Sequence, residues 1–236
     1  MNWYETAFRK QYLDLYYHRS DEAAKGEASF AAGAMGIKEG ARIVDVACGA
    51  GRHARALGAL GMHVTGVDLS RDLLAAAAGV VRVRADMRAL PFHGAFDGAT
   101  SFFTSFGYFD DAGNADTMAS IASALRPRGM FLLDFLNAAA VEAHLVPESR
   151  EERDGRQYHV RRRIDDNRVV KDVLIEEEGL TLTYSESVRL YNHHELVQLL
   201  KAAGLSVVAS YGAFDGRDFT TDAPRCILVA RKTREA

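Results

Sequence analysis

The sequence predicts an α/β protein with a doubly wound, mainly parallel sheet and an additional antiparallel segment. Between residues 42 and 135, short β-rich runs alternate with helical stretches, and a glycine-rich loop follows the first run. Strands that alternate with helices at this spacing form βαβ units, in which the strands are parallel. After residue 138 the alternation ends, and β-like runs separated by turn residues predict an antiparallel meander.

Two helices are predicted before the first strand. Aromatic residues recur every four positions along the first helix, which places them on one stripe: Tyr4, Phe8, Tyr12 and Tyr16. Ser20, followed by two acidic residues, predicts an N-cap for the second helix. Gly40 is expected to end that helix.

Five β-rich runs and the helices between them form the expected core. The runs cover residues 42–47, 62–67, 80–84, 96–103 and 129–135. Helical stretches are expected directly after Gly51, over 71–78 with Ser70 as the cap, and over 113–125. The carboxyl ends of the parallel strands then lie at one edge of the sheet, where open α/β sheets bind ligands.

The region after residue 138 predicts a different arrangement. We expect the charged segment 148–154 to be a mobile surface loop. Three β-like runs follow, over 157–164, 168–176 and 180–190, with turns at 165–167 and 178–179. Asn192 is expected to cap a helix over 193–203, and two strands follow over 205–211 and 226–231. We expect a single domain that covers residues 1–236.

Composition excludes several classes of protein. A net charge of −3 over 236 residues gives no general attraction to nucleic acid or anionic lipid. The longest strongly apolar run, residues 73–81, is far shorter than the ~20 residues of a membrane-spanning helix. The N-terminus has no apolar signal core, and Cys48 and Cys226 are the only cysteines. We therefore expect a cytoplasmic enzyme or binding domain.

The loop after the first strand is the sharpest local feature. Gly49 and Gly51 allow a tight turn and a close approach of the backbone to a ligand. The helix that follows offers unpaired N–H groups to an anionic part of that ligand. Because Gly49, Gly51 and Ala54 also satisfy G-x-G-x-x-A, the loop alone is compatible with a dinucleotide site.

Three acidic residues at successive strands narrow this interpretation. Asp45 lies inside the first strand, where a buried carboxylate needs a partner such as an ammonium group or loop N–H groups. Asp68 ends the second strand, where a carboxylate can bind both hydroxyls of a ribose. Asp86 ends the third strand and precedes Met87, a pair suited to the amino edge and the face of an adenine. Each acid alone could be a cap or turn residue, but three at one sheet edge indicate a ligand site.

The motifs DVACGAGRHA, GVDLS, ADMRALPF and LRPRGMFLLDF resemble those of the class I S-adenosylmethionine-dependent methyltransferases, in order, over residues 42–137. The resemblance implies a Rossmann-like sheet of seven strands with an antiparallel last strand, and S-adenosylmethionine as cofactor. It also implies cofactor contacts for the loop from Ala47 to Gly51 (the methionine part), Asp68 and Leu69 (the ribose), and Asp86, Met87 and Phe102 (the adenine). Ala47 stands where the family most often has a glycine.

The segments outside this core are similar to those of small-molecule N-methyltransferases. The resemblance divides the chain into a helical lid over 1–40, a core over 41–137 and 191–236, and an inserted β subdomain over 138–190 that covers the active site. Within the lid, Tyr12 would touch the cofactor and Arg19 would pair with its methionine carboxylate. Packing alone is the competing explanation for both residues.

Methyl transfer from a sulfonium is an in-line displacement, so the protein has mainly to align the reactants and exclude water. An amine acceptor also needs a base if it is protonated. Tyr108 is the candidate for a substrate-pocket residue, and His193 is a candidate base, although it could simply begin a solvated helix. The role of His53 is open. We expect no metal site.

We expect a small-molecule acceptor, with nitrogen favoured over oxygen, and a monomer or homodimer. The basic run Arg161–Arg163 alternates across a strand, so it does not indicate nucleic-acid binding. An NAD(P)-dependent oxidoreductase is the enzymatic alternative, but no Tyr-x-x-x-Lys pair occurs. A non-catalytic S-adenosylmethionine-binding protein is the third possibility.

Overall fold

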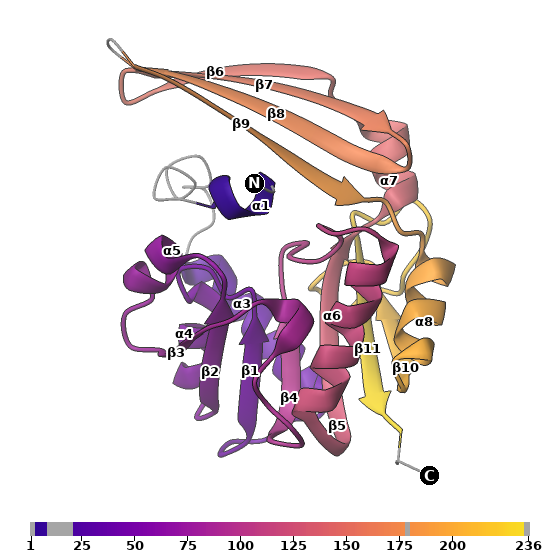
Figure 1. Ribbon diagram of the computed structural model, residues 1–236. Coiled ribbons are helices and arrows are strands. Elements are labelled where there is room, and N and C mark those ends of the chain that lie inside the picture. Colours follow the sequence, from indigo (N-terminus) through magenta and orange to yellow (C-terminus); the bar gives the residue numbers. More distant parts are fainter. Residues whose placement is uncertain (1–2, 9–20, 178–179, 234–236) are drawn as a thin grey trace.

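The computed structural model describes residues 3–8, 21–177 and 180–233, and they form two sheets of different size (Figure 1). The large sheet has seven strands in the order β10-β11-β5-β4-β1-β2-β3. The small sheet has four strands in the order β6-β7-β8-β9 and lies beyond one edge of the large sheet (Figure 1). The large sheet carries the core, and the small sheet is an insertion between β5 and the last helix of the chain.

The large sheet confirms the predicted fold class. Its strands are β1 (Arg42–Val46), β2 (His63–Asp68), β3 (Val81–Arg84), β4 (Phe96–Ser101), β5 (Leu125–Leu136), β10 (Leu205–Tyr211) and β11 (Arg225–Lys232). The first five strands pair in parallel, whereas β11 runs antiparallel to both of its neighbours, β5 and β10. The carboxyl ends of β1 to β5 therefore meet at one edge of the sheet, as the alternating pattern predicted.

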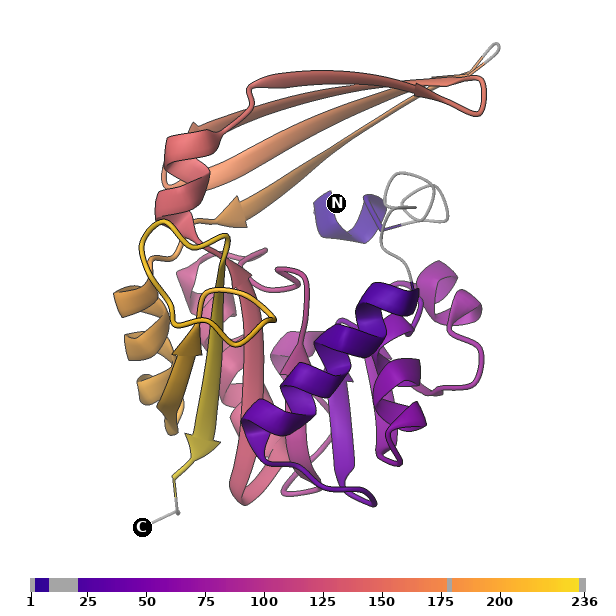
Figure 2. The same cartoon turned by 180° about the vertical axis from the view of Figure 1, so that it is seen from behind.

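Helices cover both faces of the large sheet. They are α3 (Asp21–Met35), α4 (Arg52–Ala59), α5 (Arg71–Ala76), α6 (Asp111–Ala124) and α8 (His193–Ala202), with a 3₁₀ turn, η1 (Met87–Ala89). Strand side chains alternate between two cores: Ile43 packs with α3 and α4, while Val44 packs with α6 and α8. Figure 1 shows α6 and α8 on the near face, and Figure 2 shows α3 across the opposite face.

The second N-terminal helix differs from the prediction in its end and in its role. Helix α3 ends at Met35, because Gly36 adopts a left-handed conformation with φ of 62°, four residues before the expected Gly40. Its alanine-rich side is fully covered, with Ala24, Ala28 and Ala31 all 0% exposed. Small side chains let the helix lie close to α4 and the sheet, so α3 is part of the core layer and not a lid.

Two boundaries near the site also differ, for local reasons. Strand β4 ends at Ser101 and not at residue 103, because Phe103 and Thr104 adopt positive φ angles of 55° and 58°. Helix α6 begins at Asp111, two residues earlier than expected, because the Asp110 carboxylate accepts a hydrogen bond from the Gly113 N–H at 2.8 Å. Both changes bring the β4–α6 loop to the ligand edge of the sheet.

The inserted sheet contains one strand more than predicted. It consists of β6 (Glu148–Arg153), β7 (Arg156–Asp165), β8 (Arg168–Glu177) and β9 (Leu180–Arg189), preceded by helix α7 (Ala138–His144). The expectation of a mobile loop over 148–154 is wrong, because this segment pairs antiparallel with β7 as an edge strand. Its charged side chains are typical of an edge that avoids further pairing. The predicted turn is confirmed: Asp166 and Asn167 both have positive φ.

The inserted sheet has a small apolar core of its own, and it faces the N-terminal segment. Tyr158, Val160, Val173 and Ile175 form this core. Helix α1 (Trp3–Thr6) lies between the inserted sheet and the ligand edge of the large sheet (Figure 1). The segment 3–8 is thus the described part of the N-terminus that can cover a ligand.

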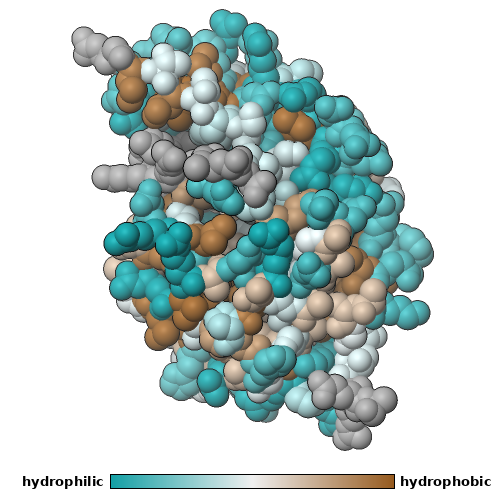
Figure 3. Space-filling model, in the orientation of Figure 1, coloured by the Kyte–Doolittle hydropathy of each residue, from teal (hydrophilic) through white to brown (hydrophobic). Residues whose placement is uncertain are grey.

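Hydrophilic residues cover much of the face seen in Figure 3, with apolar residues in small groups between them. None of the helices that the structure describes is long and apolar enough to cross a membrane.

Candidate cofactor-binding and active site

A cavity of about 380 Å³ opens at the carboxyl ends of β1, β2 and β4. Residues that follow these strands form its base, and aromatic side chains of the segment 3–8 and the β4–α6 loop form its walls. Most of the site residues predicted from the sequence line this cavity, namely Asp45, Ala47, Gly49, Asp68, Leu69, Asp86, Met87, Phe102 and Tyr108.

Asp45 is the most unusual group in the cavity. Its side chain is 2% exposed, and Oδ1 accepts a hydrogen bond from the Thr100 hydroxyl at 2.9 Å. Within the part of the chain that the structure describes, Oδ2 is buried and has no hydrogen-bond partner. Burial raises the pKa of Asp45 to about 6, although His53, Thr100 and Arg52 act in the opposite direction. A buried carboxylate oxygen without a partner is costly, so it favours a ligand that carries a positive charge here.

The loop after β1 depends on backbone conformations that glycine favours. Gly49 and Gly51 have φ angles of 54° and 76°, and Ala47 adopts a φ of 57° despite its methyl group. A Cβ on Gly51 would lie 3.0 Å from Val80 Cγ2 and 3.1 Å from Ala77 Cβ. Gly51 therefore packs behind the loop and does not line the cavity, so its predicted cofactor contact becomes a structural role.

The Asp68 carboxylate links the loop after β1 to the start of α5. Its Oδ2 accepts a hydrogen bond from the Gly49 N–H at 2.8 Å, and its Oδ1 accepts one from the Ser70 N–H at 2.8 Å. Burial raises its pKa, while these backbone donors lower it. The Ser70 hydroxyl caps α5 and donates to the Phe8 carbonyl oxygen at 2.6 Å. One short segment thus holds the glycine loop, begins a helix and anchors the N-terminal cover.

Asp86 lines the cavity beside Met87, and its carboxylate is already engaged. It caps η1 and forms an ion pair with Arg88, whose Nη2 lies 2.6 Å from Oδ2. The Arg88 side chain holds the pKa of Asp86 below its usual range. The Arg88 guanidinium also lies 4.2 Å from the ring centroid of Phe109, across the cavity wall.

His53 and Phe102 form a stacked pair at the base of the cavity. Their ring centroids are 3.9 Å apart, with an angle of 9° between the planes. His53 Nε2 lies 2.6 Å from Glu27 Oε2, so a carboxylate of α3 orients the imidazole. Phe102 packs with the α3 side of the core, and its predicted contact with adenine stays a prediction.

The aromatic wall includes Tyr108, as the sequence predicted. The Tyr108 ring centroid lies 5.0 Å from that of Trp3 and 5.5 Å from that of Phe8. Tyr4 packs edge-on against Phe109 at 4.9 Å. Phe106, from the same loop, is 1% exposed and packs against Phe135, so it belongs to the core.

Besides Gly51, three predicted residues are not placed in the cavity. His193 lies outside it: its Nε2 is 2.9 Å from the Ser210 hydroxyl and its ring stacks on Phe219 at 4.6 Å. Its role as a base is therefore a wrong prediction, because the start of α8 lies beside β10, away from the carboxyl end of β1. Tyr12 and Arg19 lie outside the described residues.

The sequence reasoning missed Arg52, Arg55 and Glu27. Arg52 and Arg55 line the cavity, and the Arg52 guanidinium lies 4.8 Å from the Phe103 ring centroid. Their position in the first turns after the glycine loop was a signal that could have found them. Glu27 is 26 residues from His53, and no local pattern connects the two.

Comparisons with known proteins identify similar domains and folds. Residues 43–129 match the family described as a methyltransferase domain. The chain is 31% identical over 122 residues to the YqeM protein of Bacillus subtilis (strain 168), a match to 48% of this chain and 49% of that protein. The chain thus spans about half the length of that relative. It is 28% identical over 205 residues to the dTDP-3-amino-3,6-dideoxy-alpha-D-glucopyranose N,N-dimethyltransferase of Streptomyces fradiae, over 78% of this chain and 77% of that enzyme.

Solved structures show the same fold. The CcbJ methyltransferase from Streptomyces caelestis superposes with a TM-score of 0.83 at 21% identity, over 98% of this chain and 99% of that one. The S-adenosylmethionine-bound structure of CalS10, an amino pentose methyltransferase from Micromonospora echinaspora, gives a TM-score of 0.70 at 22% identity, over 95% and 97% of the two chains.

The cavity combines the glycine loop with Asp45 of β1 and Asp68 of β2, at the edge of a parallel sheet that has an antiparallel β11. Residues 43–129 thus match a methyltransferase domain, and the fold of the chain is that of the class I S-adenosylmethionine-dependent methyltransferases. The described residues fit that cofactor, because the orphaned Asp45 Oδ2 provides a site for its ammonium group. The methyltransferase-domain match and this fold favour a methyltransferase over the NAD(P)-dependent oxidoreductase alternative.

Proposed function

We propose that the protein methylates the amine nitrogen of a small molecule, with S-adenosylmethionine as the methyl donor. The observation that carries this proposal is the division of the cavity into an acidic base and an aromatic wall. Asp45 and Asp68 lie at the base, and Tyr4, Phe8, Tyr108 and Phe109 form the wall. Aromatic faces attract cationic and amine groups, and a cavity of about 380 Å³ suits small ligands and not a macromolecule.

The base of the cavity holds the cofactor in this proposal. Asp45 binds its ammonium group, Asp68 binds the ribose hydroxyls, and Met87 with Asp86 borders the adenine. S-adenosylmethionine supplies an electrophilic methyl group on a positively charged sulfur. The ammonium group supplies a partner for Asp45 Oδ2, so the base of the cavity is electrostatically matched to this ligand.

The aromatic wall orients the acceptor. An amine can attack only as the neutral base, and the aromatic wall aligns its nitrogen with the methyl group. In this proposal, the Tyr108 hydroxyl accepts a hydrogen bond from the acceptor N–H and so directs the nitrogen lone pair. Two relatives whose names state an N-methyltransferase activity support nitrogen over oxygen as the acceptor atom.

We further propose that two segments outside the core determine the acceptor. They are the N-terminal segment with Trp3 and Phe8, and the inserted region 138–190. The core over 41–137 and 191–236 supplies the cofactor site in this division of the chain. The protein is a monomer or a homodimer in this proposal.

A panel of acceptors tests the proposal. The protein is incubated with S-adenosylmethionine and separate sets of amines, carboxylates and phenols, and release of S-adenosylhomocysteine is measured. We expect turnover with amines, and a larger loss of acceptor kcat/KM in Tyr108→Phe than in the matched control Tyr211→Phe, which lies on β10 outside the cavity. Turnover restricted to carboxylates or phenols contradicts the nitrogen assignment. Binding of S-adenosylhomocysteine without turnover of any class supports the non-catalytic alternative instead.

A further inference from the structure

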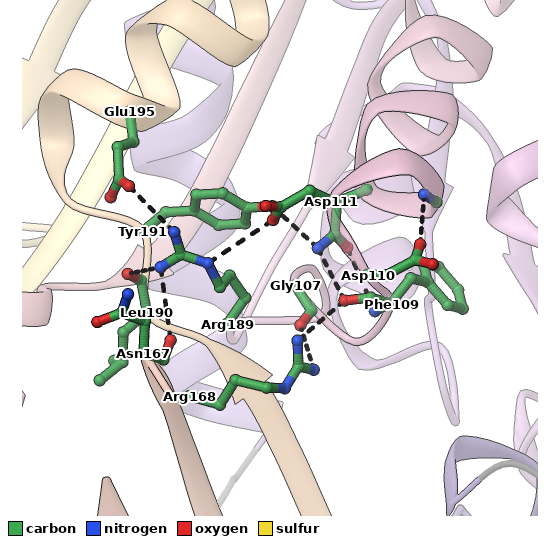
Figure 4. Close-up of polar contacts among 12 residues, drawn as sticks. Gly107, Phe109, Asp110, Asp111, Asn167, Arg168, Arg189, Leu190, Tyr191 and Glu195 are labelled. Atoms are coloured by element: carbon green, nitrogen blue, oxygen red, sulfur yellow. Dashed lines mark hydrogen bonds and ion pairs between the residues drawn. The ribbon is translucent and has the colours of Figure 1, made fainter. Parts of the chain in front are cut away.

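Arg168 joins the inserted sheet to the loop that carries Tyr108. It is the first residue of β8, and its half-buried guanidinium extends toward the β4–α6 loop (Figure 4). Nη1 donates a hydrogen bond to the Phe109 carbonyl oxygen at 3.0 Å. Nη2 donates to the carbonyl oxygens of Gly107 and Tyr108, each at 3.1 Å. Three consecutive carbonyl groups of the loop are thus bound by one side chain.

The opposite side of the guanidinium is anchored in the inserted sheet itself. Nε donates to the Ser187 hydroxyl at 2.7 Å, and Nη2 donates to the Ser187 carbonyl oxygen at 2.9 Å. Ser187 lies on β9, the strand that pairs with β8. Because the guanidinium is planar and rigid, it transmits the position of the β8–β9 pair directly to the loop.

The loop is held from two other directions, but neither of these binds Tyr108. The Arg189 N–H donates to the Gly107 carbonyl oxygen at 2.8 Å, and the Asn114 amide group binds Phe109 through both of its backbone groups. Gly107 has a φ of 87°, and a Cβ there would lie 3.1 Å from Val188 Cγ1. The loop therefore runs closely against β9, and the backbone of Tyr108 receives its hydrogen bond from Arg168.

We propose that Arg168 is a positioning residue that holds Tyr108 in the acceptor wall, so that the inserted sheet contributes to acceptor geometry through this side chain. This inference rests on the proposed role of Tyr108 in binding the acceptor. It assigns no contact between Arg168 and either ligand, since Arg168 does not line the cavity. The cofactor base, formed by residues after β1 and β2, is independent of it.

The experiment compares Arg168→Lys and Arg168→Gln with the matched control Arg163→Lys, an exposed arginine of the same sheet that pairs with Asp172. We expect the Arg168 variants to bind S-adenosylhomocysteine within about twofold of wild type while acceptor kcat/KM falls by about tenfold or more, as lost charge-assisted hydrogen bonds imply. Lysine should not restore the loss, because an ammonium group cannot bind three carbonyls in one plane. An equal loss of cofactor affinity contradicts the proposal.

Fluorescence gives a readout that needs no turnover. Trp3 is the single tryptophan of the chain and lies edge-on to Tyr108, so its emission and its quenching by acrylamide report on that contact. We expect higher quenching of Trp3 in Arg168→Gln and wild-type quenching in Arg163→Lys. Unchanged quenching in the Arg168 variants overturns the proposal, even if no acceptor of the panel is methylated.

A double-mutant cycle separates positioning from general stability. In a Tyr108→Ala background, Arg168→Lys should cause little further loss of acceptor kcat/KM, because the group that Arg168 positions is already absent. Fully additive losses contradict the proposal. If the Arg168 variants do not fold, Ser187→Ala, which removes one anchor of the guanidinium, should show the same signature at smaller size.

Discussion

The carboxylate of Asp68 accepts a hydrogen bond from the backbone N–H of Gly49 at 2.8 Å, so the acid that ends β2 also holds the loop that follows β1. This contact joins the proposed ribose site to the proposed methionine site. A ligand that binds Asp68 meets a loop whose conformation Asp68 itself stabilises.

We expect Asp68→Ala to weaken binding of S-adenosylhomocysteine by about 1–3 kcal/mol, or roughly 5- to 150-fold, because charge-assisted bonds to the ribose are lost. Calorimetric titration measures the effect. The matched control is Asp72→Ala, an exposed acid four residues later on α5. Wild-type affinity in Asp68→Ala would refute the ribose assignment.

Asp45 should make cofactor binding dependent on pH. Burial raises its pKa to about 6, so in the folded protein without ligand the Asp45 carboxyl is mostly protonated below about pH 6. The ammonium of the ligand favours the ionised carboxylate, and binding therefore releases a proton below about pH 6. We expect affinity for S-adenosylhomocysteine to rise with pH through 6 and then level off. Titrations in buffers of different ionisation enthalpy measure the released proton, which should be absent in Asp45→Asn.

The raised pKa of Asp45 also makes the stability of the protein without ligand depend on pH. A folded-state pKa above the unfolded value means that the contribution of Asp45 is present below about pH 4 and is lost as pH rises through about 6. For the protein without ligand, the free energy of unfolding of wild type relative to Asp45→Asn should fall across this window, by up to about 3 kcal/mol. Urea denaturation at pH 4, 5, 6 and 7 measures it. A difference that rises with pH would show that Asp45 has a partner in the unliganded protein.

Gly51→Ala should be more destabilising than Gly79→Ala. Both glycines have a positive φ, 76° and 74°, but an added Cβ contacts Ala77 and Val80 only at Gly51. Both variants place a Cβ on a residue with a positive φ, so this conformational cost is common to them. The difference between their losses of stability therefore measures the steric crowding of the new Cβ at Gly51. We expect about 1–3 kcal/mol more loss of stability at Gly51 in thermal denaturation. Equal losses would mean that the loop moves away without cost.

Arg225 and Asp134 form a buried ion pair beneath the β4–α6 loop. Asp134 is 0% exposed, its Oδ1 lies 2.6 Å from Arg225 Nη2, and its Oδ2 accepts the Phe103 N–H at 2.7 Å. Arg225→Met leaves a buried carboxylate unpaired, and we expect a loss of about 3 kcal/mol in urea denaturation. Adding Asp134→Asn should recover part of it. Arg217→Met, at an exposed pair with Asp215, is the control and should cost little.

The parts of the site that the sequence predicted are local in the chain. Asp45, Ala47 and Gly49 lie within five residues of one another, and Asp68 ends the next strand. The pattern of strand, loop and helix places them at one edge, because parallel strands joined by helices must point the same way. The antiparallel β11 was likewise expected, and it is confirmed beside β5.

The errors arose where structure depends on distant partners. The segment 148–154 has no alternation of apolar and polar residues, and its strand character comes from pairing with β7. The end of α3 depended on which of two glycines, Gly36 or Gly40, stopped the helix. Its role was also mispredicted, because a helix of a lid and a helix of the core have the same periodicity of apolar residues. His193 was placed by its order in the chain, whereas α8 lies at the β10 side of the sheet.

The sequence by itself determined the sheet, the cofactor loop and the acids at its edge, because these depend on spacings of a few residues. Which residues surround the proposed acceptor site followed only from the tertiary structure. The pairs His53 with Glu27 and Arg168 with the 107–109 loop join residues that are 26 and about 60 positions apart. Such contacts follow from how the inserted sheet and the helices pack on the core, and packing of separate elements leaves no periodic signal in the chain.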